Sequence, residues 1–266
     1  MVLEGTQRIG IKDIKLEYEK MLEPLKERFW SSELTSAPIM VGEKYNSCTF
    51  NGKPLRIMYV GRAMNGWETK WNEGTTKELV EQVFSNEMDM KIISKGIATD
   101  ENGNQIYNYN QSPFWQLCHQ LMNLFGIEEN WSDYVAWSNL YKVSPMNSGN
   151  PNNELIKKTI KHCTNILRRE ISHLRPTHIV FVTDSWWYEP EGIDENAFKD
   201  IIGVEVSKEE IKDKDKGEII ILGKGISKNF HFEPKIVIAK RPEGKKGTMR
   251  FKADQIFNAF LKLENN

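Results

Sequence analysis

Apolar residues along the chain fall into two kinds of pattern that alternate with each other. Short, almost continuous apolar runs predict strands that are buried on both faces. We expect five of them, at residues 55–61, 134–140, 178–182, 219–222 and 235–239. Apolar residues that recur every three or four positions predict amphipathic helices. We expect four of these, at residues 11–30, 113–125, 153–175 and 253–263.

The ends of these helices carry signals of their own. Ser112 is expected to cap the second helix, while Pro113 suits its first turn and Gly126 its end. Pro24 is expected to kink or split the first helix, because proline lacks the backbone hydrogen-bond donor. The polar segment 31–53 is predicted to be a loop.

Strands that alternate with helices indicate an α/β fold, a three-layer α/β/α arrangement with a central, mainly parallel sheet. In such sheets ligands bind beyond the carboxyl ends of the strands, so functional residues are best sought there. Residues 205–218 hold six acids and four lysines, and we interpret them as a solvated loop or hairpin and not as a site.

The composition and charge of the chain argue against several classes of protein. The 266 residues carry a formal charge of −1, which does not suit a protein that coats DNA. The three cysteines are widely spaced and no histidines pair at ligand spacing, so we expect no disulfide framework, no metal and no cofactor. No apolar run approaches the ~20 residues of a membrane helix, and the N-terminus does not resemble a signal peptide. A cytoplasmic protein is therefore expected.

The first predicted strand runs into VGRAMNGWE, a glycine-containing turn with several polar groups. Gly61 allows the backbone to approach a ligand closely, and Arg62 adds a cation. Asn65 and Glu68, further along the turn, add an amide and a carboxylate. A glycine turn with an exposed arginine explains the same pattern equally well.

Two further residues are candidates for holding a nucleobase. Asn139, at the end of the second strand, can present a donor and an acceptor to a base edge, although asparagine there more often caps a turn. Phe114, in the first turn of the second helix, could stack on a base. It also shares a face with apolar core positions, so a place in the core is equally open.

The fifth strand ends in a basic segment, KRPEGKKGTMRFK. Its cations could contact the phosphates of a nucleic acid, although a solvated loop would have the same composition. The candidate phosphate contacts are Lys240, Lys245, Lys246 and Arg250. After the third strand, Trp186, Trp187 and Tyr188 suit either the lining of a site or the capping of the core.

Taken in order, five segments resemble the uracil-DNA glycosylase superfamily, most closely its thermophile-type iron–sulfur branch. They are VGRAMNGWE, SPFWQLCHQLMNLFGI, WSNLYKVSP, LRREISHLRPTHIVFV and KRPEGKKG. The resemblance covers about residues 55–263. It implies a glycosylase-like α/β domain over residues 54–266 with an insertion at about 185–234. Residues 1–53 would be an N-terminal extension made of a helix and a loop.

The resemblance also implies roles for individual residues. Phe114 would stack on a base flipped out of the strand, and Asn139 would hydrogen-bond the edge of that base. Arg241 stands where the family has a histidine that stabilises charge on the departing base. The family's acid in the first motif is Arg62 here and a cluster-ligating cysteine is Val143, so no iron–sulfur cluster is expected.

These features predict a base-flipping DNA-repair protein that binds single- or double-stranded DNA and hydrolyses the N-glycosidic bond of uracil or a damaged base. Arg241 would stabilise the leaving base, and Asn65 or Glu68 would orient water. The alternative is a catalytically degenerate member of the fold that binds a nucleic acid or nucleotide without turnover. A third hypothesis is an enzyme that acts on free nucleosides or nucleotides.

Overall fold

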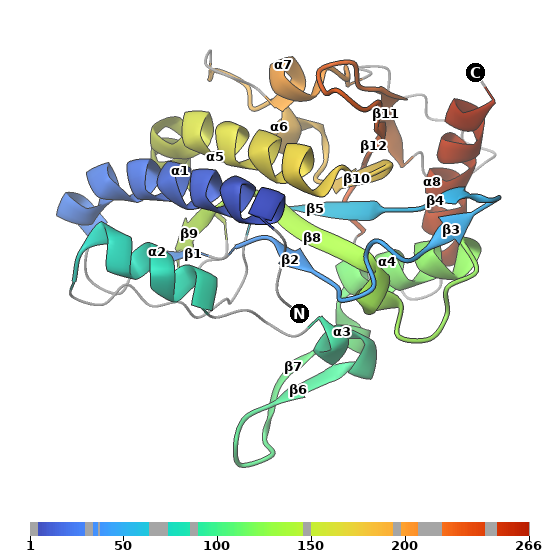
Figure 1. Ribbon diagram of the computed structural model, residues 1–266, viewed down its shortest axis with the longest axis horizontal. Helices are drawn as coiled ribbons and strands as arrows, with labels where there is room; N and C mark the ends of the chain where they lie inside the picture. Colours follow the sequence, from blue (N-terminus) through green and yellow to red (C-terminus); the bar gives the residue numbers. More distant parts are fainter. Residues whose placement is uncertain are drawn as a thin grey trace.

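A mixed six-stranded β-sheet forms the centre of the molecule, and helices cover both of its faces (Figure 1). The computed structural model describes residues 5–29, 34–36, 38–63, 74–85, 90–145, 150–193, 198–206, 220–242 and 249–265. The strand order is β11 (Ile221–Ile226), β12 (Lys235–Ala239), β10 (His178–Val182), β5 (Ile57–Ala63), β8 (Val135–Tyr141) and β2 (Met40–Val41). The middle four strands are parallel, and β11 and β2 are antiparallel at the two edges.

The four parallel strands confirm the predicted central sheet. β10 and β12 have the predicted bounds, whereas β5 and β8 lie two residues and one residue further along the chain than expected. The strand predicted at 219–222 is displaced, because β11 begins at Ile221 and runs antiparallel to β12.

The loop prediction for residues 31–53 is wrong in part. Besides β2, this segment contains β1 (Leu34–Ser36), which pairs with β9 (Val143–Pro145), and β3 (Thr49–Phe50), which pairs with β4 (Lys53–Pro54). Strands of two or three residues are held by backbone hydrogen bonds and are too short to show an apolar pattern in the sequence.

The residues of β5 alternate between two apolar layers. Met58 and Val60 face the layer of α1 (Gly5–Phe29) and α5 (Asn153–Leu174). Ile57 and Tyr59 face the layer of α4 (Pro113–Leu124) and α8 (Met249–Glu264). Figure 1 shows the two helix pairs on opposite sides of the sheet. The three-layer α/β/α arrangement is therefore confirmed.

The predicted helix-end signals are confirmed in part, because α4 begins at Pro113 after Ser112 as expected. Pro24 lies inside α1, at an exposed position, and does not divide that helix. Ser112 takes the N-cap position of α4, but its side chain makes no capping hydrogen bond within the described part of the chain. The cap of α5 does form, since the side chain of Asn152 accepts the backbone N–H of Leu155 at 2.9 Å.

The predicted N-terminal extension and the predicted insertion at about 185–234 both contribute residues to the hydrophobic core. In α1, the buried residues Tyr18, Met21 and Leu22 pack in the same cluster as α5. In segment 185–234, α6 (Ser185–Tyr188) and α7 (Phe198–Ile202) add buried aromatic residues, and β11 extends the sheet. Most of the acid- and lysine-rich stretch lies outside the described residues. Cys48, Cys118 and Cys163 are free thiols.

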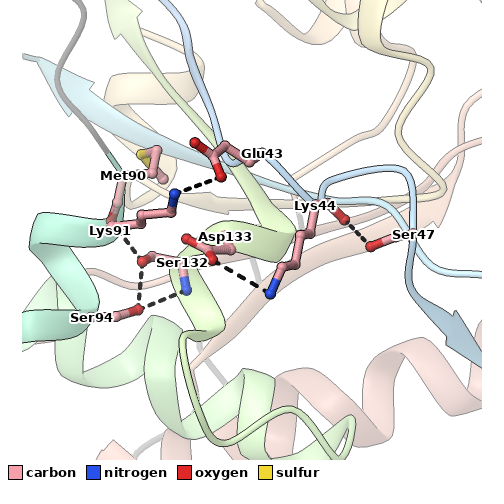
Figure 2. A network of polar contacts seen from close by, with 8 residues as sticks. All are labelled: Glu43, Lys44, Ser47, Met90, Lys91, Ser94, Ser132 and Asp133. Carbon is pink, nitrogen blue, oxygen red and sulfur yellow. Dashed lines mark hydrogen bonds and ion pairs between the residues drawn. The ribbon is translucent and has the colours of Figure 1, made fainter. Parts of the chain in front are cut away.

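A hairpin arm that the sequence did not reveal projects from the body (Figure 1). It consists of β6 (Ile97–Thr99) and β7 (Gln105–Asn108) and follows α2 (Thr76–Ser85) and α3 (Lys91–Lys95). Polar contacts fix its base (Figure 2). Lys91 Nζ lies 2.6 Å from Glu43 Oε2, and Ser132 Oγ donates to the Met90 carbonyl at 2.6 Å. These contacts join the start of α3, at the base of the arm, to the body of the protein.

Candidate functional site

The parallel strands end side by side, and several candidate residues lie at those ends. The register places Gly61 of β5 opposite Asn139 of β8. β10 lies between β5 and β12, and Lys240 and Arg241 directly follow β12. The structure therefore brings Gly61, Arg62, Asn139 and Arg241 to the same carboxyl edge of the sheet.

Gly61 makes room for the side chain of Asn139. A β-carbon built on Gly61 would lie 2.5 Å from Asn139 Oδ1, too close for a real contact. Asn139 is only 7% exposed, and its amide has no hydrogen-bond partner among the described residues. It lies inside β8, so the turn-capping interpretation is wrong. A ligand with a complementary donor and acceptor would pair with this amide.

Aromatic rings surround this pair. Trp137 lies on the same face of β8 as Asn139, and its Nε1 is 3.6 Å from the β-carbon built on Gly61. The ring centroid of Phe114 is 6.3 Å from that of Trp137 and 4.8 Å from that of Trp115. Phe114 is half-buried, so part of its ring packs on the core and part stays exposed beside the strand ends.

On the other side of Gly61, a carboxylate links two arginine-bearing segments. Arg62 forms an ion pair with Asp184, and its guanidinium carbon lies 5.6 Å from the ring centroid of Trp187. The other carboxylate oxygen of Asp184 accepts the backbone N–H of Arg241 at 2.9 Å. Asp184 thereby fixes the start of the basic segment to the end of β5.

Asp184 is the residue of this edge that the sequence analysis missed. Its backbone has φ 60° and ψ 172°, a region that residues other than glycine occupy at a cost of about 1–3 kcal/mol. Its two side-chain contacts over-determine that conformation, as is typical of functional edges. The rule that pointed to the ends of the other strands could have found it, because Asp184 follows β10 by two residues.

The remaining candidates are spread over described and undescribed segments. Lys240 is half-buried and its backbone N–H donates to the Ile220 carbonyl at 2.8 Å. Arg250, on the first turn of α8, is exposed and pairs with Asp254 at 3.4 Å. The catalytic candidates Asn65 and Glu68 and the phosphate candidates Lys245 and Lys246 lie outside the described residues.

The opposite face of β8 holds a closed polar cluster. Lys142 Nζ lies 2.7 Å from Glu170 Oε2 of α5, and Ser138 Oγ donates to the same oxygen at 2.7 Å. All three side chains are at most 3% exposed. Cys163 packs beside them and accepts the Lys142 backbone N–H at 3.4 Å, and burial raises the pKa of its thiol to about 11. No reactant can reach this cluster, so its role is structural.

A separate cavity of about 320 Å³ lies between the base of the arm and α4. Trp115 connects it to the strand ends, because this residue lines the cavity and also packs 4.8 Å from Trp137. The described residues that line it include Glu128 and Glu129 but no lysine or arginine. Carboxylates repel phosphate, so the carboxyl edge of the sheet suits a nucleotide better than this cavity does.

Comparison with models of known protein families and with curated protein sequences found no match to this chain. Within the residues that the structure describes, no group of three or more histidine, cysteine, aspartate or glutamate side chains could hold a metal ion. None of the described helices combines the length and the apolar character needed to cross a membrane.

Proposed function

We propose that this chain is a uracil-DNA glycosylase-like protein that binds nucleic acid and holds one extruded nucleobase at the carboxyl edge of its sheet. The observation that carries the proposal is the pairing of Gly61 with Asn139. Gly61 has no side chain, so the amide of Asn139 lies against its backbone, and this buried residue makes no side-chain hydrogen bond to any described residue. An amide offers both a donor and an acceptor, which suits the edge of a base.

The surroundings of Asn139 support the same ligand. Phe114 and Trp137 provide flat apolar surfaces close to the amide, and stacking on such rings is worth about 1–3 kcal/mol per base. Arg241 and Arg62 lie along the same edge and carry charge opposite to that of a phosphate backbone. The sheet order, with helices on both faces, is compatible with the five segments that resemble the superfamily.

Hydrolysis of the N-glycosidic bond is the activity we propose for this site. Cleavage leaves positive charge on the sugar and negative charge on the departing base. The guanidinium of Arg241 would stabilise that negative charge, a contribution of roughly 2.7–4 kcal/mol for a preorganised donor. Asn65 or Glu68 would orient the attacking water.

One observation favours the alternative, a binding protein without turnover. The position at which the family carries an acid is Arg62, and this arginine pairs with Asp184. An arginine held by an aspartate can attract phosphate but cannot activate water.

The test measures binding and cleavage on the same substrate, a uracil-containing single-stranded oligonucleotide. We expect salt-dependent binding and alkali-labile abasic sites at enzyme excess. Asn139→Ala should weaken binding about tenfold, because a bidentate base contact is worth about 1–3 kcal/mol. Asn102→Ala, the same change at the exposed tip of the arm, is the matched control and should have no effect.

Each result has a definite meaning. Binding with abasic sites supports the glycosylase proposal. Binding that depends on Asn139, without abasic sites from uracil or other damaged bases, supports the alternative. Absence of binding, or binding that Asn139→Ala leaves unchanged, overturns the proposed site.

A further inference from the structure

The structure separates one of the three aromatic residues after β10 from the other two. Trp187 and Tyr188 are 3% and 0% exposed and cap the core, whereas Trp186 is 51% exposed. Trp186 follows Asp184 by two residues and therefore lies at the same carboxyl edge as the nucleobase site. Neither the fold nor the proposed base contact uses this ring.

Trp186 is held in position although it is exposed. Its ring centroid lies 4.0 Å from that of the buried Trp187, with 37° between the two planes. The guanidinium carbon of Arg62 lies 5.8 Å from the ring centroid of Trp186, and an ion pair with Asp184 holds Arg62 in turn. A ring that is already immobilised loses less conformational freedom when a ligand stacks on it.

The position of Trp186 fits a neighbouring nucleotide of the same strand. β5 separates β8, with Asn139, from β10, which ends just before Asp184. Adjacent strands are about 4.8 Å apart, so the end of β10 lies roughly 10 Å from Asn139. Trp186 itself packs on Trp187 of the layer of α1 and α5, whereas Asn139 faces the layer of α4, so a bound strand has to cross this edge of the sheet. A stacked nucleic-acid strand advances about 3.4 Å per nucleotide, so at least about three nucleotides are needed. Arg62, on the strand between them, supplies a cation along that path.

We propose that Trp186 stacks on an unpaired base close to the one held at Asn139, and that the preferred ligand is therefore single-stranded nucleic acid. The proposal rests on the proposed function and specifies its substrate. Bases inside a duplex are covered on both faces by their neighbours, so an exposed ring finds free base faces along an unpaired strand but only at the two ends of a duplex. Because every base has such a face, this contact tolerates any sequence.

The test compares three ligands: a short uracil-containing single strand, the blunt duplex of the same sequence, and the mononucleotide dUMP. We expect the wild-type protein to bind the single strand at least about tenfold more tightly than the duplex. Trp186→Ala should weaken binding of the single strand about tenfold or more, and Trp186→Phe should stay within about threefold of wild type. Binding of dUMP should be the same in all three proteins.

Ile106→Ala is the matched control, because Ile106 is 65% exposed on the arm and far from the strand ends along the chain. It should leave every affinity unchanged. The inference is overturned if Trp186→Ala binds the single strand like wild type, or if wild type binds the duplex equally well. In both of these cases the base site at Asn139 stands. A protein that binds none of the three ligands overturns the proposed function, and this inference with it.

Discussion

The two faces of β8 bury polar side chains in opposite ways. Toward α5, Ser138 and Lys142 each lie 2.7 Å from Oε2 of Glu170, whose Oε1 has no hydrogen-bond partner among the described residues, and the cluster is closed to solvent. Toward α4, Asn139 is buried almost as deeply but has no hydrogen-bond partner among the described residues. A buried polar group that is paired supports the fold, whereas one that is unpaired reduces stability until a ligand completes it. Under the proposed function, adjacent residues of one strand therefore serve stability and binding separately.

The closed cluster gives the largest expected effect. Glu170→Gln should lower the free energy of unfolding by about 3–5 kcal/mol, because it leaves the charge of Lys142 buried without its counter-ion. Urea denaturation measures the loss. The control is Glu154→Gln on the same helix, where an exposed glutamate pairs with Lys158 at 3.3 Å and should contribute less than about 0.5 kcal/mol. Equal losses for the two variants would show that burial of the Lys142 pair does not matter.

A third buried polar group, His178, lies at the amino end of the sheet. The pH dependence of stability tests how its buried surroundings affect its protonation. His178 is 3% exposed, with Nδ1 2.9 Å from Thr177 Oγ1 and Nε2 3.4 Å from Glu264 Oε1. Burial, helped by the charge of Lys235, lowers the pKa of His178 to about 4.

The sign of the pH effect follows from that lowered pKa. In the unfolded chain the imidazole has a pKa of about 6.5, so between about pH 6.5 and 4 the unfolded state binds more protons. Stability should therefore be complete above about pH 6.5 and fall as the pH is lowered toward 4, by an amount on the order of 3 kcal/mol. His178→Phe should flatten unfolding curves measured across this range. An unchanged slope in that variant would assign the acid sensitivity to other groups.

Much of the fold could be predicted because it depends on apolar periodicity. β10 and β12 have five consecutive residues that are almost all apolar, and α5 has an apolar stripe at regular spacing, so their bounds follow from the chain itself. The arm could not be found in this way, because β7 is exposed along most of its length and shows no buried face. The short edge strand β2 is likewise defined by its backbone pairing with β8.

The candidate site could be predicted only in part, for a similar reason. The rule about strand ends selected Gly61 and Asn139 from local sequence, and the resemblance selected Arg241. It could not reveal that Asp184 joins Arg62 to the backbone of Arg241, because that contact links three strands far apart in the chain. Nor does the sequence tell Trp186 from Trp187, since exposure depends on what packs against each ring.

Gly61→Ala tests whether the face of β8 toward α4 can lose binding affinity while the protein keeps its stability. The added methyl group would lie 2.5 Å from Asn139 Oδ1, and the end of this side chain can move away at little cost. We expect a change of less than about 1 kcal/mol in unfolding but about a tenfold loss of affinity for the uracil-containing strand, because the amide is displaced. Gly225→Ala in β11, where the new carbon would lie 3.3 Å from Val204, is the control and should retain affinity. If Gly61→Ala retains full affinity, Asn139 does not contact the base.

The smallest expected change in stability comes from the residue with the largest proposed role in binding. Asn139→Leu removes an amide that has no hydrogen-bond partner among the described residues and keeps a side chain of similar size, so the free energy of unfolding should rise by up to about 1 kcal/mol. Ser138→Ala, one residue earlier, removes a hydroxyl bonded to Glu170 and should make unfolding about 1–2 kcal/mol more favourable. Thermal denaturation should therefore shift in opposite directions for the two variants, which lie on the two faces of β8. A loss of stability in Asn139→Leu as large as that in Ser138→Ala would mean that the amide supports the fold, and the distinction between the two faces would fail.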